Sequence, residues 1–296
     1  MQIGRDVFGG SAGNSGTVSA EGRIEQLNIG GSLVGGPASA TGRISAGEIG
    51  FIGIGHHLLG SSISGTAADL SFTGHILSEG IIQNVRVGGS IIAGFDASTG
   101  GALRFNASIL AEDNLGAVNV KGSLIGHATP EGLSSIVISA GGRASLDPGE
   151  EDIAIESLTV GGRVERAQIL AGYLNATTPV NGNASIGAVK IGGNWIASDL
   201  VAGAKADADP GAAPNFFGDA DDERIALTGT NESRIAGVVI KGLVVGTAGA
   251  GDHFGFVAKE ISSFKSLGFT APLTSDLNPD VIELFTPTAD VTIREV

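Results

Sequence analysis

The sequence predicts an all-β protein, a right-handed parallel β-helix (β-solenoid) of about nine irregular rungs that ends in a C-terminal cap. A motif of alternating aliphatic residues followed by Gly-Gly returns along almost the whole chain. The composition, with 49 Gly, 42% hydrophobic residues, 1 Trp and 1 Tyr, favours many short strands joined at glycine-rich corners. The copies recur at intervals of 21 to 49 residues, about the range in which supersecondary units stack into solenoids.

The clearest copy of the motif runs from Ile24 to Gly36. The slots of Leu27 and Ile29 are aliphatic in every clear copy, whereas the residue between them varies. Alternation with a period of two indicates a strand with one buried face. The slot of Gly31 is Gly in all clear copies except one, which indicates a corner with positive φ or a close approach of two backbones.

Two further strands complete each predicted rung. The aliphatic pair after the corner, Leu33-Val34 in the clearest copy, should point its first member inward, and a third strand follows at 43–46, 108–111 and 136–140. Nine rungs stacked at about 4.8 Å would form a rod of roughly 40 Å. The residues before the nine corners serve as markers and are Phe8, Ile29, Ile54, Val87, Val120, Val160, Ile191, Ile240 and Ser266.

The rungs are assigned to residues 1–268, with an insertion loop at 205–224, and the cap to residues 269–296. A solenoid must cover its last rung or expose a sheet edge, and three prolines after Gly268 mark a change of character. No such cap precedes the first rung, so its edge could continue into more repeats or pair with another subunit. The rival fold, a β-sandwich, is disfavoured because Asn-Gly and Asp-Gly hairpin turns are nearly absent.

Charge and composition exclude several classes of function. A formal net charge of −14 with only 17 Lys and Arg disfavours nucleic acid and anionic membranes as partners. The most apolar window, 235–251, is interrupted by Lys241 and several glycines, so we expect buried strands there and no membrane insertion. The absence of Cys excludes disulfides, and the first residues contain no export signal.

The acidic insertion is the best candidate for chemistry. Carboxylates that alternate with small residues suit Ca²⁺, which prefers oxygen ligands, although the spacing is not that of an EF-hand. The alternative is a solvated acidic loop. The candidate Ca²⁺ ligands are Asp207, Asp209, Asp219, Asp221, Asp222 and Glu223.

No catalytic residue is predicted. His56 and His57 are adjacent, so on a strand they would point to opposite faces and could not share one metal ion; a tolerated substitution at a corner explains them. Gly9-Gly-Ser-Ala-Gly13 matches the nucleophile-elbow pattern, but no helix follows it.

The repeat Ile82-Gln-Asn-Val-Arg-Val-Gly-Gly-Ser-Ile-Ile-Ala-Gly94, together with the ending Ala289 to Val296, resembles the C-terminal portions of large bacterial secreted or surface proteins built from β-strand repeats. This resemblance covers about residues 3–296. It implies export to the cell surface or the extracellular space, a stacked β-helix and structural or adhesive roles, and it brings no catalytic residues.

We therefore expect a non-enzymatic structural module of an exported protein, acting as a surface rod, spacer or self-assembling or adhesive element that associates through its solenoid ends. The alternative is a carbohydrate-active β-helix, similar to a polysaccharide lyase or hydrolase, that uses the acidic loop. The outward slots beside the core strand contain no acid pair, which disfavours that alternative; they are Asn28, Gly53, Arg86, Asn119, Thr159, Lys190 and Val239.

Overall fold

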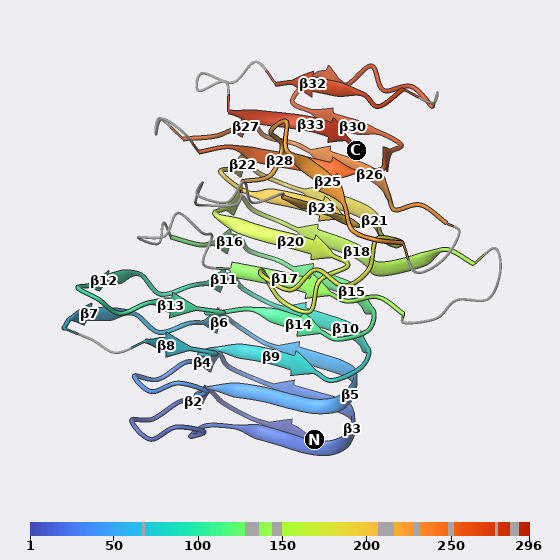
Figure 1. The fold of residues 1–296 in the computed structure, drawn as a ribbon. Coiled ribbons are helices and arrows are strands. Elements are labelled where there is room, and N and C mark those ends of the chain that lie inside the picture. The colour runs from blue at the N-terminus through green and yellow to red at the C-terminus, as the bar shows by residue number, and fades with distance from the viewer. Residues whose placement is uncertain are drawn as a thin grey trace.

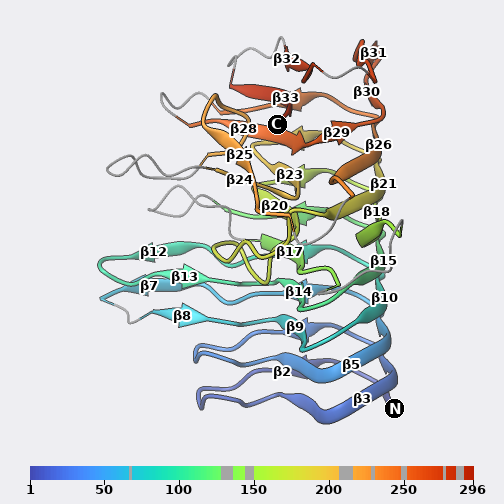
Figure 2. The same ribbon diagram turned by 45° about the vertical axis from the view of Figure 1, so that its right-hand side comes forward.

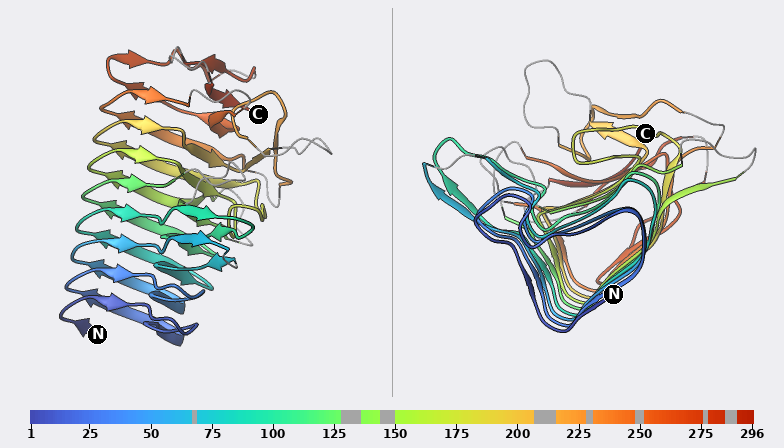
Figure 3. Two further views of the ribbon diagram at one scale, coloured as in Figure 1. Left: turned by 90° about the vertical axis from the view of Figure 1, so that its left-hand side faces the viewer. Right: turned by 90° about the horizontal axis from the view of Figure 1, so that it is seen from below.

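The protein is all-β, and its long sheets are built mainly from parallel strands (Figure 1). The computed structural model describes residues 1–66, 69–127, 136–143, 150–206, 216–227, 231–247, 252–275, 278–284 and 290–296, and these contain no helix. Successive turns of the chain lie in layers one above another (Figure 3). The first turn lies at one end of the stack and the last strands at the other.

Three faces of parallel strands enclose the core (Figure 3). The first face contains β1 (Gln2–Ile3), the second halves of β3 (Val18–Ile29) and β5 (Arg43–Ile54), β10 (Ile82–Val87), β15 (Leu115–Val120), β18 (Asp152–Val160), β21 (Ala184–Ile191), β26 (Arg234–Ile240), β29 (Glu260–Ile261) and β30 (Phe264–Ser266). The second face contains β2 (Val7–Phe8), β4 (Leu33–Val34), β6 (Leu58–Leu59), β11 (Ile91–Ile92), β16 (Leu124–Ile125), β19 (Val164–Glu165), β22 (Trp195–Ile196) and β27 (Val244–Val245). The third face contains the first halves of β3 and β5, β9 (His75–Ser78), β14 (Ile109–Ala111), β17 (Ile136–Ala140), β20 (Ala167–Ala171), β23 (Asp199–Ala202), β28 (Phe254–Ala258) and β33 (Val291–Glu295).

Eight consecutive parallel pairings place one residue of each predicted copy in a single column of the first face. The column is Ile3, Ile29, Ile54, Val87, Val120, Val160, Ile191, Ile240 and Ser266. It confirms eight of the nine predicted markers.

The marker of the first copy was wrong. Phe8 pairs with Val34 on the second face, and Ile3 takes the slot that had been assigned to Phe8. The Gly-Gly-Ser at residues 9–11 imitates a corner, but the first corner is Gly4-Arg5-Asp6. The error arose because Asp6 takes in this corner the place that Ser takes in the corners at Ser32, Ser90 and Ser123.

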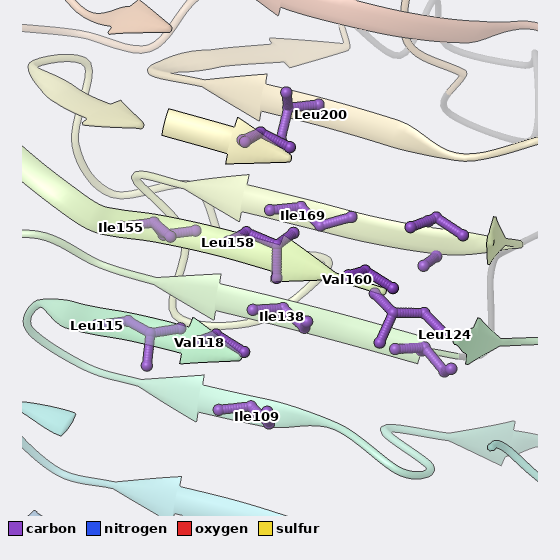
Figure 4. Close-up of a cluster of buried hydrophobic side chains, with 14 of the residues drawn as sticks. Ile109, Leu115, Val118, Leu124, Ile138, Ile155, Leu158, Val160, Ile169 and Leu200 are labelled. Carbon is purple, nitrogen blue, oxygen red and sulfur yellow. The ribbon is translucent and has the colours of Figure 1, made fainter. Parts of the chain in front are cut away.

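The core is a stack of equivalent slots that are filled mostly by aliphatic side chains, with Trp195, Phe256 and Phe264 near the C-terminal end (Figure 4). Leu27, Ile29 and Leu33 are at most 1% exposed, whereas Asn28 and Val34 are half-buried, as the alternation predicts. Burial of each such side chain contributes about 1.5–3 kcal/mol, which makes the repeated slots the main source of stability.

A chain of hydrogen bonds runs along the corners between the first and second faces, and we call it the corner ladder. In each step a side chain accepts a hydrogen bond from the backbone N–H of the equivalent residue in the next layer. The acceptors are Asp6, Ser32, His57, Ser90, Ser123 and Asn194, and the donors are Ser32, His57, Ser90, Ser123, Arg163 and Leu243, at 2.5 to 3.3 Å. The ladder is interrupted at Arg163, whose side chain has no acceptor atom and pairs with Glu165.

The corner ladder explains the corner glycines. A Cβ atom at Gly122 would collide with the Ser90 hydroxyl, and one at Gly162 would collide with that of Ser123. The predicted close approach is therefore present. The predicted positive φ is not, because none of the glycines in the Gly31 slot adopts it.

Positive φ occurs instead at the turn that leads into the third face. Gly42 and Gly74 have φ of 57° and 58°, and a Cβ atom on either would strike a carbonyl of the second-face strand in its own turn. Side chains just before these glycines close the same turns, since Gly36 N donates to Thr41 Oγ1 at 2.9 Å and Ser61 N to Thr73 Oγ1 at 3.0 Å.

The two ends of the stack differ. At the C-terminal end, β31 (Phe269–Thr270) and β32 (Val281–Glu283) pair antiparallel with β30 and β33, while β33 itself adds a parallel strand to β28. At the N-terminal end, β1 pairs with only the last two residues of β3.

In the described part of the chain, two excursions that contain strands lie outside the three faces (Figure 2). The first contains β7 (Ile63–Gly65), β8 (Leu70–Ser71), β12 (Asp96–Ser98) and β13 (Leu103–Arg104), which pair in parallel across two layers over a small cluster of Ile63, Leu70 and Leu103. The second contains β24 (Ala204–Ala206) and β25 (Asp222–Arg224), within the predicted insertion.

Candidate acidic site on the third face

The acidic insertion leaves the stack directly after β23 and returns antiparallel to itself. Ala204 pairs with Arg224 and Ala206 with Asp222. Lys205 and Glu223 face each other in this pair and form an ion pair. Glu223, one of the predicted Ca²⁺ ligands, is therefore already partnered by a cation.

A second apolar cluster fixes the returning segment against the outward side of the third face. Phe217 and Ile225 pack with Tyr173 over Leu170 and Val201, all at most 6% exposed. The Tyr173 hydroxyl donates to the carbonyl of Ala204 at 2.8 Å. These contacts hold the acidic residues between Phe217 and Ile225 at a defined place on the sheet.

Three of the predicted ligands come together there. One carboxylate oxygen from each of Asp219, Asp221 and Asp222 lies within 4.8 Å of the others. Asp222 is 8% exposed; its Oδ2 accepts from Gly218 N at 2.6 Å, while its buried Oδ1 has no hydrogen-bond partner. Arg294 approaches the same segment and donates to the carbonyl of Ala220 at 3.3 Å.

The geometry raises the pKa of two of these carboxyl groups. The main cause that raises the pKa of the exposed Asp221 to about 6 is the hydrogen bond that its protonated form donates to the neighbouring Asp219 carboxylate. Burial raises the pKa of Asp222 to about 8, and the charge of Asp219 adds to the effect. The cluster therefore binds protons in a range where isolated aspartates are ionised.

Beneath the segment lies a buried acid that the sequence analysis missed. Asp199 is 4% exposed; its Oδ1 accepts from Gly255 N at 3.0 Å and its Oδ2 from Gln168 Nε2 at 3.3 Å. Burial raises the pKa of Asp199 to about 7. The sequence did contain a signal for this buried acid, because Asp199 begins the otherwise apolar run Asp199 to Ala202 and a charged residue in a buried strand needs hydrogen-bond partners.

The remaining residues considered as metal ligands or catalytic residues either have structural roles or lie outside the described residues. Asp207 and Asp209 lie outside the described residues. His57 belongs to the corner ladder, where its Nδ1 accepts from Ser90 N at 3.0 Å, and His56 is exposed. Ser11, the serine of the elbow-like motif, is exposed in a turn.

His75 was also missed. It is fully buried on the third face, and neither ring nitrogen has a hydrogen-bond partner. The ring lies edge-on to Phe72 with 5.2 Å between centroids. Burial is the main cause that lowers the pKa of His75 to about 3, with a smaller effect from the charge of Arg43, so the ring is neutral at neutral pH.

Comparisons with protein-family models, curated proteins and solved structures found no match to this chain. Across the described part of the chain, no helix is long and apolar enough to cross a membrane.

Proposed function

We propose that the chain is a right-handed parallel β-helix of about nine rungs that serves as a rigid, non-enzymatic structural module. It would act as a rod or spacer within an exported bacterial protein; export is supported only by the resemblance of the repeat to secreted β-strand-repeat proteins.

The corner ladder is the observation that carries this proposal. The repeated polar side chains of the corner ladder, from Asp6 to Asn194, accept hydrogen bonds from backbone N–H groups of the next layer. The repeated aliphatic slots are likewise buried in the core. What repeats in the sequence thus holds neighbouring layers together, and extended stacks of this kind form rods.

The rod can be tested by a distance measurement, because the chain contains no native Cys. Gln2 and Lys265 lie in one column, separated by eight layers. Spin labels on Gln2→Cys and Lys265→Cys should give a narrow distribution centred at roughly 40 Å, since eight steps of about 4.8 Å separate them. A broad distribution, or one that changes between salt and sugar additives, would refute the rigid spacer.

The spacing of the carboxyl groups in the acidic site disfavours the alternative, a carbohydrate-active enzyme, relative to the structural module. Retaining and inverting glycosidases hold their two carboxyl groups about 5–5.5 Å and about 6.5–9.5 Å apart, to leave room for the substrate or a water. The Asp219 and Asp221 carboxylates have oxygens within 4.8 Å of each other, and Asp219 Oδ1 also accepts from Asp221 N at 3.4 Å, so no substrate or water is accommodated between them. Turnover of any member of a polysaccharide panel that Asp221→Asn abolishes would reverse this ranking.

We also propose that the acidic site binds a divalent cation of the Ca²⁺ type. A buried carboxylate with an unpaired oxygen favours this, because Asp222 Oδ1 costs free energy unless an ion, a proton or water satisfies it. Asp219 and Asp221 would complete an oxygen-rich set within reach of the same ion. An ion there would also tie the returning segment to the stack.

Calorimetric titration with Ca²⁺ tests the cation. Affinity should increase between pH 6 and 9, because the ion must displace the proton held by Asp222, whose pKa is raised to about 8. Asp222→Asn should abolish the saturable heat. Glu223→Gln removes the same charge from the same segment but from a residue paired with Lys205, so it is the matched control and should bind as the wild type does. Equal effects of the two variants would contradict the site.

A further inference from the structure

The acidic insertion contacts the last two strands of the third face on its way back to the stack. Residues 216–222, which we call the crossing segment, lead into β25 beside β28 (Figure 2). A Cβ atom on Gly255 would lie 2.6 Å from Gly218 N, and one on Gly218 would lie 2.8 Å from Gly255 Cα. Only glycine fits at these two positions, because the backbones of the crossing segment and of β28 meet there.

The strand β33 presents a cation to the crossing segment. The outward column of the third face is apolar in the two preceding layers, at Val201 and Val257, and continues with Arg294. The Arg294 guanidinium donates to the carbonyl of Ala220 at 3.3 Å, and its charge acts on two carboxylates of the acidic site. This contact joins the acidic site to β33.

His253, which lies just before β28, makes a second link to β33. Its Nε2 and the Thr292 hydroxyl are hydrogen-bonded at 2.8 Å, and the ring is also hydrogen-bonded to the backbone of Gly218. By strand pairing, β33 is bonded to β28 on one edge and to three residues of β32 on the other. The crossing segment therefore adds contacts that hold β33 beyond its own strand pairing.

The carboxylates of the acidic site make the position of the crossing segment depend on what they bind. Oxygens of Asp219, Asp221 and Asp222 lie within 4.8 Å of one another, so like charges meet when all three are ionised. Arg294 compensates only one of these charges. A divalent cation would compensate the other two and so hold the crossing segment against β28 and β33.

We propose that Ca²⁺ bound at the acidic site fastens β33 to the stack through the contacts of the crossing segment with Gly255, His253 and Arg294. This inference rests on the proposed cation site and adds what the site regulates, which is the closure of the last layer of the third face. A cation that binds the closed arrangement more tightly than the open one stabilises the closed arrangement. Without the cation, the crossing segment and β33 should open more often.

Hydrogen–deuterium exchange of the full chain, followed by mass spectrometry, tests this regulation. Peptides that cover β33 should exchange at least about tenfold more slowly with Ca²⁺ at about 100 times its dissociation constant than with a chelator, because linkage at that concentration allows up to about 100-fold. Peptides from β3 and β5, at the other end of the stack, should exchange equally in both conditions. This comparison uses the wild type alone and does not depend on any variant.

Arg294→Gln removes the guanidinium contact with Ala220 but leaves every carboxylate of the acidic site in place. The variant should still give saturable heat with Ca²⁺, while the slowing of exchange at β33 should fall at least about threefold, because a charge-assisted hydrogen bond is lost. Lys265→Gln is the matched control, since it removes an exposed cation from the first face at the same end of the stack and should respond to Ca²⁺ as the wild type does. Fluorescence of the buried Trp195 reports whether each variant is folded.

The outcomes separate this regulation from the cation site on which it rests. Saturable heat in the wild type with unchanged exchange at β33 would overturn the regulation and leave the cation site in place. The absence of saturable heat would overturn both. Equal losses of slowing in Arg294→Gln and Lys265→Gln would contradict the link through Arg294.

Discussion

Replacing Asp199 with Asn should make the protein more stable at alkaline pH. Burial raises the pKa of Asp199 from 3.8 in the unfolded chain to about 7. Its contribution to stability is therefore fully present below pH 3.8 and is lost as the pH rises to about 7, because the unfolded chain releases a proton that the native state retains. Asn carries no charge at any pH, so the variant lacks this loss.

The structure sets the size of the effect. The rise in the pKa of Asp199 from 3.8 to about 7 corresponds to about 4 kcal/mol of stability, because a tenfold change in a proton-binding constant is worth about 1.4 kcal/mol. The substitution keeps the local hydrogen bonds: the Asn carbonyl can accept from Gly255, and its amide can donate to Gln168 Oε1, which has no partner in the wild type. Asp222, whose pKa is raised to about 8, retains its own pH dependence, so the slope should be reduced and not abolished.

Urea denaturation between pH 4 and pH 8.5, followed by fluorescence of the buried Trp195, measures this difference. The stability of the Asp199→Asn variant relative to wild type should grow by up to about 4 kcal/mol across that range. Glu223→Gln, an exposed change on the neighbouring segment, is the control. Parallel pH profiles for wild type and Asp199→Asn would refute the argument that this carboxyl group is buried in its charged form at alkaline pH.

Four further substitutions test the scaffold. Gly74→Ala should lower the free energy of unfolding by about 2 kcal/mol or more in thermal or urea denaturation, because φ is 58° and the added Cβ atom would strike a carbonyl of β6. Gly65→Ala is its control: φ is 72° but no atom lies within 4 Å of the added Cβ, so only the backbone strain of about 1 kcal/mol should be lost. His75→Leu should reduce the loss of stability on acidification from pH 6.5 towards 3, because in the wild type the unfolded chain binds a proton in this range and the native His75, with its pKa lowered to about 3, does not. Equal acid sensitivity of the two proteins would contradict this prediction. Ser123→Ala removes the acceptor of the Arg163 N–H and should lower the free energy of unfolding by about 1 kcal/mol, and an unchanged melting curve would deny the ladder any energetic role.

The sequence predicted the architecture well because the physics that builds a layer is local. Alternation at Leu27 and Ile29 defines which side is buried, and the return of the pattern defines the stacking. The first layer was misaligned because register depends on contacts between layers, which a single strand does not reveal. Asp6 and Ser32 differ in type but serve the same hydrogen bond, and only the pairing of Ile3 with Ile29 makes this visible.

The acidic site was predicted only in part, because its local contacts can be read from the sequence and its contacts between layers cannot. Asp219, Asp221 and Asp222 are neighbours in sequence, so their clustering could be anticipated from spacing alone. Asp199 and Gln168 meet across a layer boundary, 31 residues apart in the chain, and the length of each excursion decides which residues become neighbours. No local pattern encodes that length.

The corner ladder gives a physical reason for the glycine content of the chain. Five of the six ladder side chains project into the space that the next layer's corner would need for a Cβ atom, as Ser90 does towards Gly122; Ser32, which lies below His56, is the exception. A ladder side chain in one layer therefore favours a Gly in the next layer, and the repeated Gly-Gly-Ser reflects this preference. Glycine in these corners allows close contact between layers, which is why a chain with 49 glycines can still form regularly stacked layers.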